Sequence, residues 1–118
     1  HLQKEPSMQA KLIQVLKGSI QDIIVDLRKD SQTYGKHMSI ILKDSDSKQI
    51  FIPEGFAHGF LTLENETLVM YKTSKYYDKK NEVTIRWNDK NLDIKWMITD
   101  KDIILSDKDS EGILFKDY

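Results

Sequence analysis

Apolar residues recur in short runs separated by polar turns, and this pattern predicts a chain of β-strands with little helix. Strands at this close spacing favour a β-sandwich or a closed barrel. The tail is mixed, and short helical turns are expected around residues 88–91 and 106–112. The predicted strands are residues 10–18, 19–28, 36–43, 49–53, 59–64, 67–77 and 83–87.

Glycine and proline mark where these strands should end. Lys17 and Gly18 predict a turn between the first two strands. Pro53 stops a strand because proline has no N–H to donate to a neighbouring strand. Glu54 and Gly55 then predict a tight turn, since glycine adopts a positive φ at no steric cost.

Length and charge narrow the class of protein. The 118 residues predict a single domain spanning residues 1–118. The 18 Lys and Arg nearly balance the 19 Asp and Glu, so no charged field draws the chain to nucleic acid or to an anionic membrane. No apolar run approaches the ~20 residues of a membrane span, and no signal peptide is visible. The absence of cysteine excludes disulfides and thiolate metal sites, and it fits a cytoplasmic protein.

The segment FIPEGFAHGF, residues 51–60, places His58 within an apolar run. One interpretation is a half-buried core histidine whose ring nitrogens meet backbone groups. The other is a histidine that faces a ligand at the mouth of a barrel. A metal site needs several converging ligands, but the chain has three histidines and no His-x-His pair, and His37 is expected at the surface. We therefore expect no metal.

Several motifs, in this order and spacing, resemble the dTDP-4-dehydrorhamnose 3,5-epimerases, a family of cupin-fold sugar-nucleotide epimerases. FIPEGFAHGFLTLENETLVMYKTSKYY, residues 51–77, resembles the family signature. HLQ at residues 1–3 resembles the end of the family's RGLHxQ motif. The further matches are KLIQVLKGSIQDIIVDLRKDSQTYGK at 11–36, IRWNDKNLDIKW at 85–96 and LSDKD at 105–109.

The resemblance implies an all-β, cupin-type jelly roll, in agreement with the strand pattern. It also implies a homodimer in which N-terminal strands cross to the partner subunit. The family's arginine before GLH has no counterpart here, since the sequence begins at His1. We therefore expect that the domain lacks upstream N-terminal strands.

The resemblance also assigns roles to individual residues. His1 falls on the catalytic base, and Asp109 on the acid that orients it. Tyr71 falls on the catalytic proton donor, and Lys11 on the lysine near the substrate's carbonyl. The residues that fall on substrate contacts are Tyr77, which stacks on thymine, His58, Glu82, Lys108 and the buried acid Asp22.

The implied substrate is a dTDP-linked 6-deoxy sugar with a ketone at C4, in dTDP-L-rhamnose biosynthesis. Protons at C3 and C5 are acidic because their removal gives an enolate delocalised onto the C4 oxygen. An imidazole takes such a proton, a lysine ammonium stabilises the negative charge, and a second group returns a proton to the opposite face. The reaction needs no redox cofactor and no metal.

Other interpretations stay open. Related cupins epimerise only C3 or only C5, or convert 4-keto into 3-keto sugars, and a non-catalytic sugar-nucleotide-binding cupin is a further alternative. Taken alone, Tyr71 resembles a core aromatic residue, and Trp87 and Trp96 resemble core or interface residues. Period-two alternation nevertheless places Tyr71 with Val69 on the face that should line the barrel interior, which favours epimerisation.

Overall fold

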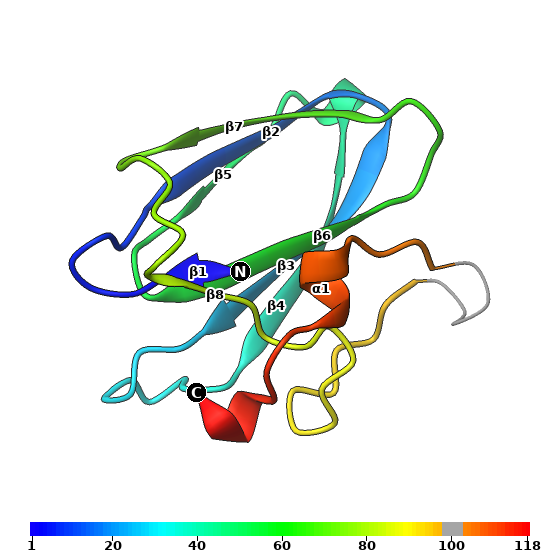
Figure 1. Cartoon of the computed structure of the whole chain (residues 1–118). Helices are drawn as coiled ribbons and strands as arrows, with labels where there is room; N and C mark the ends of the chain where they lie inside the picture. Colours follow the sequence, from blue (N-terminus) through cyan, green and yellow to red (C-terminus); the bar gives the residue numbers. More distant parts are fainter. Residues whose placement is uncertain (98–102) are drawn as a thin grey trace.

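The computed structural model describes residues 1–97 and 103–118, and in these residues β-strands predominate (Figure 1). The described residues contain one short α-helix, near the C-terminal end, and two 3-10 turns. The strands are β1 (Leu2–Gln3), β2 (Lys11–Lys17), β3 (Ser19–Asp26), β4 (His37–Lys43), β5 (Gln49–Ile52), β6 (Phe56–Thr62), β7 (Leu68–Thr73) and β8 (Glu82–Val83). The helical elements are η1 (Asp44–Asp46), α1 (Asp107–Ser110) and η3 (Phe115–Asp117).

Two three-stranded antiparallel sheets face each other. One has the strand order β5-β2-β7 and the other the order β4-β3-β6, while β1 pairs with β8 in a small third sheet. Figure 1 shows the two larger sheets facing each other, and apolar residues from both sheets pack between them. This arrangement confirms the predicted all-β jelly roll.

The chain changes sheets at Gly18. Its φ is +80°, and a Cβ at this position would lie 2.7 Å from Oγ1 of Thr67, so both the conformation and the close approach require glycine. The predicted turn is therefore present. Strands β2 and β3 do not pair with each other, however, because each takes its partners from a different sheet.

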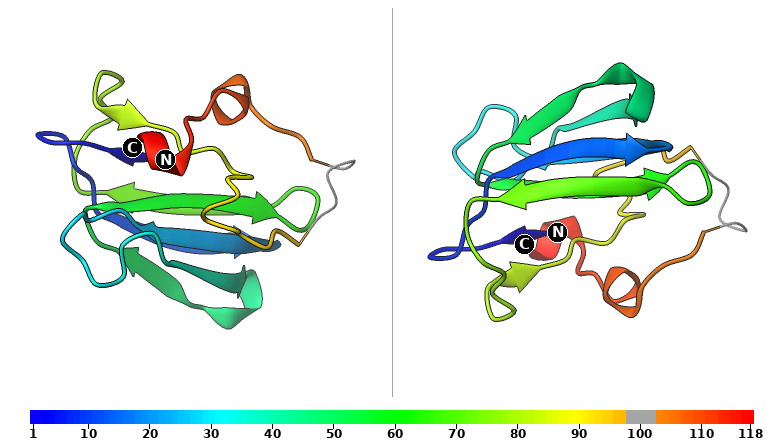
Figure 2. Two further views of the ribbon diagram at one scale, coloured as in Figure 1. Left: turned by 90° about the horizontal axis from the view of Figure 1, so that it is seen from below. Right: turned by 90° about the horizontal axis from the view of Figure 1, so that it is seen from above.

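Apolar residues pack on both faces of β3, and every residue of this strand is buried. One face meets the barrel interior, where Ile20 and Ile24 pack with Ile13 and Leu42. The other face is covered by the segment after β8, which lies on the side of β6 and away from β5 (Figure 2). The outer cluster comprises Leu2, Ile23, Val25, Leu27, Ala57 and Leu92, with partly buried residues such as Trp96 and Phe115 packed against it.

Some predicted boundaries are wrong. Strand β6 begins at Phe56 rather than residue 59, because the chain re-enters the sheet directly after Gly55, whose φ is +84°. Strand β7 ends at Thr73 rather than residue 77. Residues 83–87 contribute only the end of β8 and an isolated bridge between Ile85 and Ile113.

The expected helical turn at 106–112 is present as α1, whereas residues 88–91 form hydrogen-bonded turns without a helix. Across the described ranges, no helix is long and apolar enough to span a membrane.

Candidate active site

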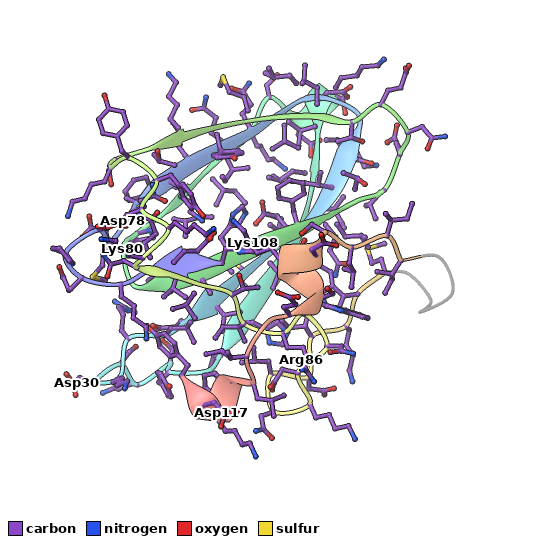
Figure 3. The ribbon with its side chains drawn as sticks, in the orientation of Figure 1. Asp30, Asp78, Lys80, Arg86, Lys108 and Asp117 are labelled. Carbon is purple, nitrogen blue, oxygen red and sulfur yellow. The ribbon has the colours of Figure 1, made fainter. Side chains whose placement is uncertain are left out.

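An open cavity of about 850 Å³ lies where β6, β7 and β8 approach α1. The cavity brings together residues that are far apart in the sequence. Lys108 of α1 lies beside the barrel, where it lines the cavity (Figure 3). Asp22 is the one predicted site residue outside its wall. The predicted residues that line the cavity are His1, Lys11, His58, Tyr71, Tyr77, Glu82, Lys108 and Asp109.

His1 and Asp109 form a close pair on the cavity wall. Nε2 of His1 lies 2.5 Å from Oδ1 of Asp109, although the two residues stand at opposite ends of the chain. Because an ionised carboxylate only accepts hydrogen bonds, Asp109 selects the ring form in which Nε2 carries the proton. The pair thus has the geometry of an imidazole oriented by an acid.

The helix α1 fixes Asp109 through its own N-cap. Oγ of Ser106 accepts a hydrogen bond from the backbone N–H of Asp109 at 3.2 Å and donates one to Oδ2 of its carboxylate at 2.7 Å. One carboxylate oxygen is thereby held by Ser106 and the other faces His1. Burial opposes ionisation of Asp109, but hydrogen bonds from Ser106 and His1 hold its pKa below the usual value.

Glu82, Lys108 and Tyr77 form a second polar group in the cavity. Lys108 lies 2.8 Å from Glu82, and the Tyr77 hydroxyl donates to Glu82 at 2.7 Å. Burial of Glu82 raises its pKa, but hydrogen bonds from Lys108 and Tyr77 outweigh this and hold the pKa below the usual value. Glu82 is therefore ionised and ties β8 to α1.

Tyr77 follows β7 in a loop, not on a strand as predicted, and Lys108 Nζ lies 5.1 Å from the centre of its ring. The neighbouring Tyr76 is 97% exposed, so the two tyrosines do face different ways. This leaves Tyr77 as the tyrosine of the pair that reaches the cavity.

His58 and Asp22 form a buried pair below the cavity surface. Nε2 of His58 lies 3.0 Å from Oδ2 of Asp22, and both side chains are buried. The second carboxylate oxygen, Oδ1 of Asp22, has no hydrogen-bond partner among the described residues. Both sequence interpretations of His58 are thus partly right, since it is buried but also lines the cavity. Its ring nitrogen meets a carboxylate rather than a backbone group.

Lys11 and Tyr71 enter the cavity from the opposite sheet. They lie on the paired strands β2 and β7, where Tyr71 is opposite Ile13 and Lys11 is opposite Thr73. Burial lowers the pKa of Lys11, while the charges of Glu82 and Asp22 act in the opposite direction. Tyr71 shares its strand face with Val69, as predicted, but is 59% exposed because the cavity is open at this point.

Sequence reasoning missed one contact of the central histidine. Nδ1 of His1 lies 2.9 Å from Oγ1 of Thr84. The available signal was the position of Thr84 two residues after Glu82, which places both side chains on the same face of an extended strand.

The remaining expectations concern the two tryptophans, His37 and metal binding. Trp96 packs on the outer core and donates from Nε1 to the Trp87 carbonyl at 2.8 Å, as expected of core residues, but both rings also line the cavity. His37 is exposed, as predicted. In residues 1–97 and 103–118, no group of three or more His, Asp and Glu is arranged to hold a metal ion.

Comparison with known proteins identifies close relatives. The family profile described as dTDP-4-dehydrorhamnose 3,5-epimerase matches residues 1–117. An epimerase of that name from Shigella flexneri is 43% identical over 117 residues, which are 99% of this chain and 64% of the relative. The chain thus spans less than two thirds of the length of this relative.

Solved structures agree with the sequence matches. The Bacillus anthracis dTDP-4-dehydrorhamnose 3,5-epimerase, with TDP and PPi bound, superposes with a TM-score of 0.92 at 49% identity, over 96% of this chain and 63% of that one. A Legionella pneumophila 3,5-epimerase in complex with dTDP-4-keto-L-rhamnose gives a TM-score of 0.89 at 36% identity, over 95% of this chain and 59% of that one.

Proposed function

Because the chain belongs to the dTDP-4-dehydrorhamnose 3,5-epimerase family, we propose that it inverts C3 and C5 of dTDP-4-dehydro-6-deoxy-D-glucose to give dTDP-4-dehydro-L-rhamnose. The observation that carries this proposal is the His1–Asp109 pair in one cavity with Lys11 and Tyr71. These four side chains supply a base, its orienting acid, a cation and a proton donor. The protein is then an isomerase.

His1 is the base in this mechanism. Asp109 accepts from Nε2–H, so the lone pair of the neutral ring is on Nδ1. The Thr84 hydroxyl faces that nitrogen at 2.9 Å, so the substrate must displace this contact before His1 removes the proton from the carbon next to the C4 ketone. The carboxylate of Asp109 then stabilises the imidazolium that forms, as an orienting acid does in other histidine-dependent enzymes.

Lys11 stabilises the enolate. Removing a proton at C3 or C5 places negative charge on the C4 oxygen, and a fixed ammonium in a partly buried site stabilises this charge more strongly than water does. Glu82 and Asp22 favour the charged form of Lys11, which burial alone would disfavour. The two carboxylates therefore offset part of the effect of burial on the pKa of Lys11.

Tyr71 returns a proton to the opposite face of the sugar. It lies on β7, whereas His1 adjoins β1, so the two side chains approach the cavity from different sheets. A phenol is protonated at neutral pH yet acidic enough to protonate an enolate. The imidazolium of His1 then releases its proton to solvent and the phenolate takes one up, after which the cycle is repeated at the second carbon.

Tyr77 and Lys108 are suited to the nucleotide part of the substrate. An exposed tyrosine ring offers a flat surface for thymine, and Lys108 supplies positive charge beside it. The Bacillus anthracis and Legionella pneumophila relatives bind TDP and dTDP-4-keto-L-rhamnose respectively, which supports a dTDP-linked substrate. A homodimer with exchanged N-terminal strands and a cytoplasmic location remain predictions.

The test is hydrogen exchange between substrate and solvent in His1→Asn and Asp109→Asn. We expect His1→Asn to abolish deuterium incorporation at C3 and C5 while dTDP binding is retained. Asp109→Asn should slow incorporation by roughly 10²–10⁴-fold, because an amide no longer selects the reactive ring form or stabilises the imidazolium. His37→Asn, on an exposed histidine, is the control. Normal exchange in both site variants would contradict the proposal.

A further inference from the structure

The loop that carries Tyr77 has little to fix it in place from its own strand. Strand β7 ends at Thr73, and Tyr77 is 58% exposed, so burial does not hold its ring. The Tyr77 hydroxyl donates to Oε2 of Glu82 at 2.7 Å, which holds the tip of the ring. A fixed ring also requires a fixed backbone, and the contacts of Gln3 supply it.

Gln3 of β1 holds the loop through its side-chain amide. Its Nε2 donates to the carbonyl of Tyr76 at 3.3 Å, and its Oε1 accepts from the backbone N–H of Asp78 at 2.7 Å. These two bonds lie on either side of Tyr77 in the chain, and Figure 3 shows Asp78 beside β1. A C=O and an N–H on either side of one residue are groups with which a neighbouring strand would pair. One side chain thus replaces a partner strand.

Glutamine suits this position because its amide both donates and accepts. Gln3 is 5% exposed, and its Nε2 also donates to the Ser7 carbonyl at 2.6 Å. A carboxylate has no donor for the two carbonyls, and an ammonium has no acceptor for the N–H. The buried amide of Gln3 therefore uses its nitrogen and its oxygen to join residues 3–7 to the Tyr77 loop.

The rest of the loop is tied to the same part of the chain. Oδ2 of Asp78 accepts from the Ser7 hydroxyl at 2.7 Å, and the backbone N–H of Lys4 donates to the carbonyl of Asn81 at 2.8 Å. Hydrogen bonds from Ser7 and Asn81 lower the pKa of Asp78, so its carboxylate remains an acceptor. These bonds hold the end of the loop, whereas Gln3 contacts the two residues that flank Tyr77.

We propose that Gln3 is a positioning residue for the nucleotide part of the substrate, because it holds Tyr77 in place before thymine binds. This inference rests on the part of the proposed function in which the Tyr77 ring stacks on thymine. A ring that is already ordered loses less conformational freedom on binding, so the affinity for the nucleotide is higher. His1 adjoins β1, so one short segment carries both the base and the residue that positions the nucleotide contact.

Gln3→Met and Tyr77→Ala, alone and combined, test the proposal. Methionine keeps the unbranched shape of glutamine without its donor and acceptor. In Gln3→Met, the Kd for dTDP, measured by calorimetry, should rise by about tenfold. The rate of deuterium incorporation at saturating substrate should fall by a smaller factor.

The combined variant separates positioning from general structural damage. In the Tyr77→Ala background, Gln3→Met should have little further effect on the Kd, because the ring through which Gln3 acts is absent. An equal loss of affinity with and without the Tyr77 ring would overturn the inference, since Gln3 would then only stabilise the fold.

A measurement on the unmodified protein tests the same contact, even if Gln3→Met does not fold. Amide hydrogen exchange by NMR should show the Asp78 N–H protected from solvent to the same degree with and without dTDP, because Gln3 holds it in the free protein. Protection that appears only with dTDP would overturn the inference, since the ligand would then order the loop. Rapid exchange in both states would overturn it as well.

Failure of the inference and failure of the proposed function give different results. If the unmodified protein binds dTDP and incorporates deuterium at C3 and C5, but the effects of Gln3→Met and Tyr77→Ala are independent, the epimerase proposal stands and Gln3 has no positioning role. If the protein binds dTDP but exchanges no substrate proton, the epimerase proposal fails, and coupled effects of the two variants would still support the role of Gln3 in nucleotide binding. If it binds no dTDP, both fail.

Discussion

Tyr71 joins the cavity through strand geometry that the sequence alone reveals. Alternation along residues 67–73 places it with Val69 on the inner face of β7, and the pairing of Tyr71 with Ile13 bears this out. Its high exposure was not predictable, because exposure depends on where the two sheets separate and not on the period of one strand. A phenol at an open cavity is accessible both to a bound sugar and to solvent.

Tyr71→Phe should separate proton removal from inversion. Phenylalanine keeps the ring and removes only the acidic proton, while His1 is unchanged. We expect deuterium still to enter the substrate at a rate within a few-fold of normal, with yield of the inverted L-sugar reduced by about 10²-fold or more. The measurement is deuterium incorporation and product stereochemistry in one sample. Tyr76→Phe is the control, since Tyr76 is 97% exposed; inverted product at the normal rate from Tyr71→Phe would exclude Tyr71 as the acid.

At the scale of elements, Asp26 holds the connection between β3 and β4. Its carboxylate accepts two hydrogen bonds from the Arg28 guanidinium, at 2.9 and 2.8 Å, and one each from the hydroxyls of Ser31 and Thr33, at 2.6 Å. The Arg28 contacts contribute most to a pKa of Asp26 far below its usual range, although burial opposes this. Asp26 is therefore ionised in the folded state.

Asp26→Asn should destabilise the fold and remove part of its acid sensitivity. A depressed folded-state pKa contributes stability above the unfolded pKa of ~3.9, and this contribution is lost progressively as pH falls below about 4. We expect the variant to lose about 1.5–3 kcal/mol at pH 7, because the buried side chain at position 26 loses its charge-assisted hydrogen bonds. Its stability should then decline less steeply below pH 4.

Denaturant unfolding between pH 3 and pH 7 measures this effect. Asp30→Asn is the matched control, since Asp30 belongs to the same connection but points into solvent (Figure 3). Equal losses of stability in the two variants, or an unchanged pH dependence in Asp26→Asn, would show that the Asp26 contacts do not stabilise the ionised form.

Elements that depend on the local sequence could be predicted, whereas features that depend on pairing between distant segments could not. Most strands could be located from local apolar runs, and α1 from the polar SDKD segment that caps it. The change of sheet at Gly18 could not be predicted, because a turn residue fixes the direction of the chain but not which strands pair. The predicted end of β7, residue 77, is wrong for a similar reason. Residues 74–77 have a strand-like composition but pair with no other strand.

At the scale of the whole molecule, the site depends on contacts between distant parts of the chain. His1 and Asp109 meet across 108 positions, and no spacing rule in the sequence predicts that contact. The resemblance to a family identified the candidate site residues, and all of them except Asp22 line the cavity. The contact between Thr84 and His1 could not be predicted because it depends on the β1–β8 register, which involves strands of only two residues each.

The same scale gives the most direct test of the central claim, that one cavity inverts two carbons of the sugar. The protein is incubated with dTDP-4-keto-6-deoxyglucose in deuterium oxide, and the sugar is analysed by NMR for deuterium at C3 and C5 and for configuration at both. We predict deuterium at both carbons and the L-configured dTDP-4-dehydrorhamnose as product. Deuterium and inversion at one carbon alone would instead indicate a single-centre epimerase, and a 3-keto product would indicate an isomerase. Binding of the nucleotide sugar with no deuterium at either carbon would contradict the account, because a base that removes no proton cannot epimerise the sugar.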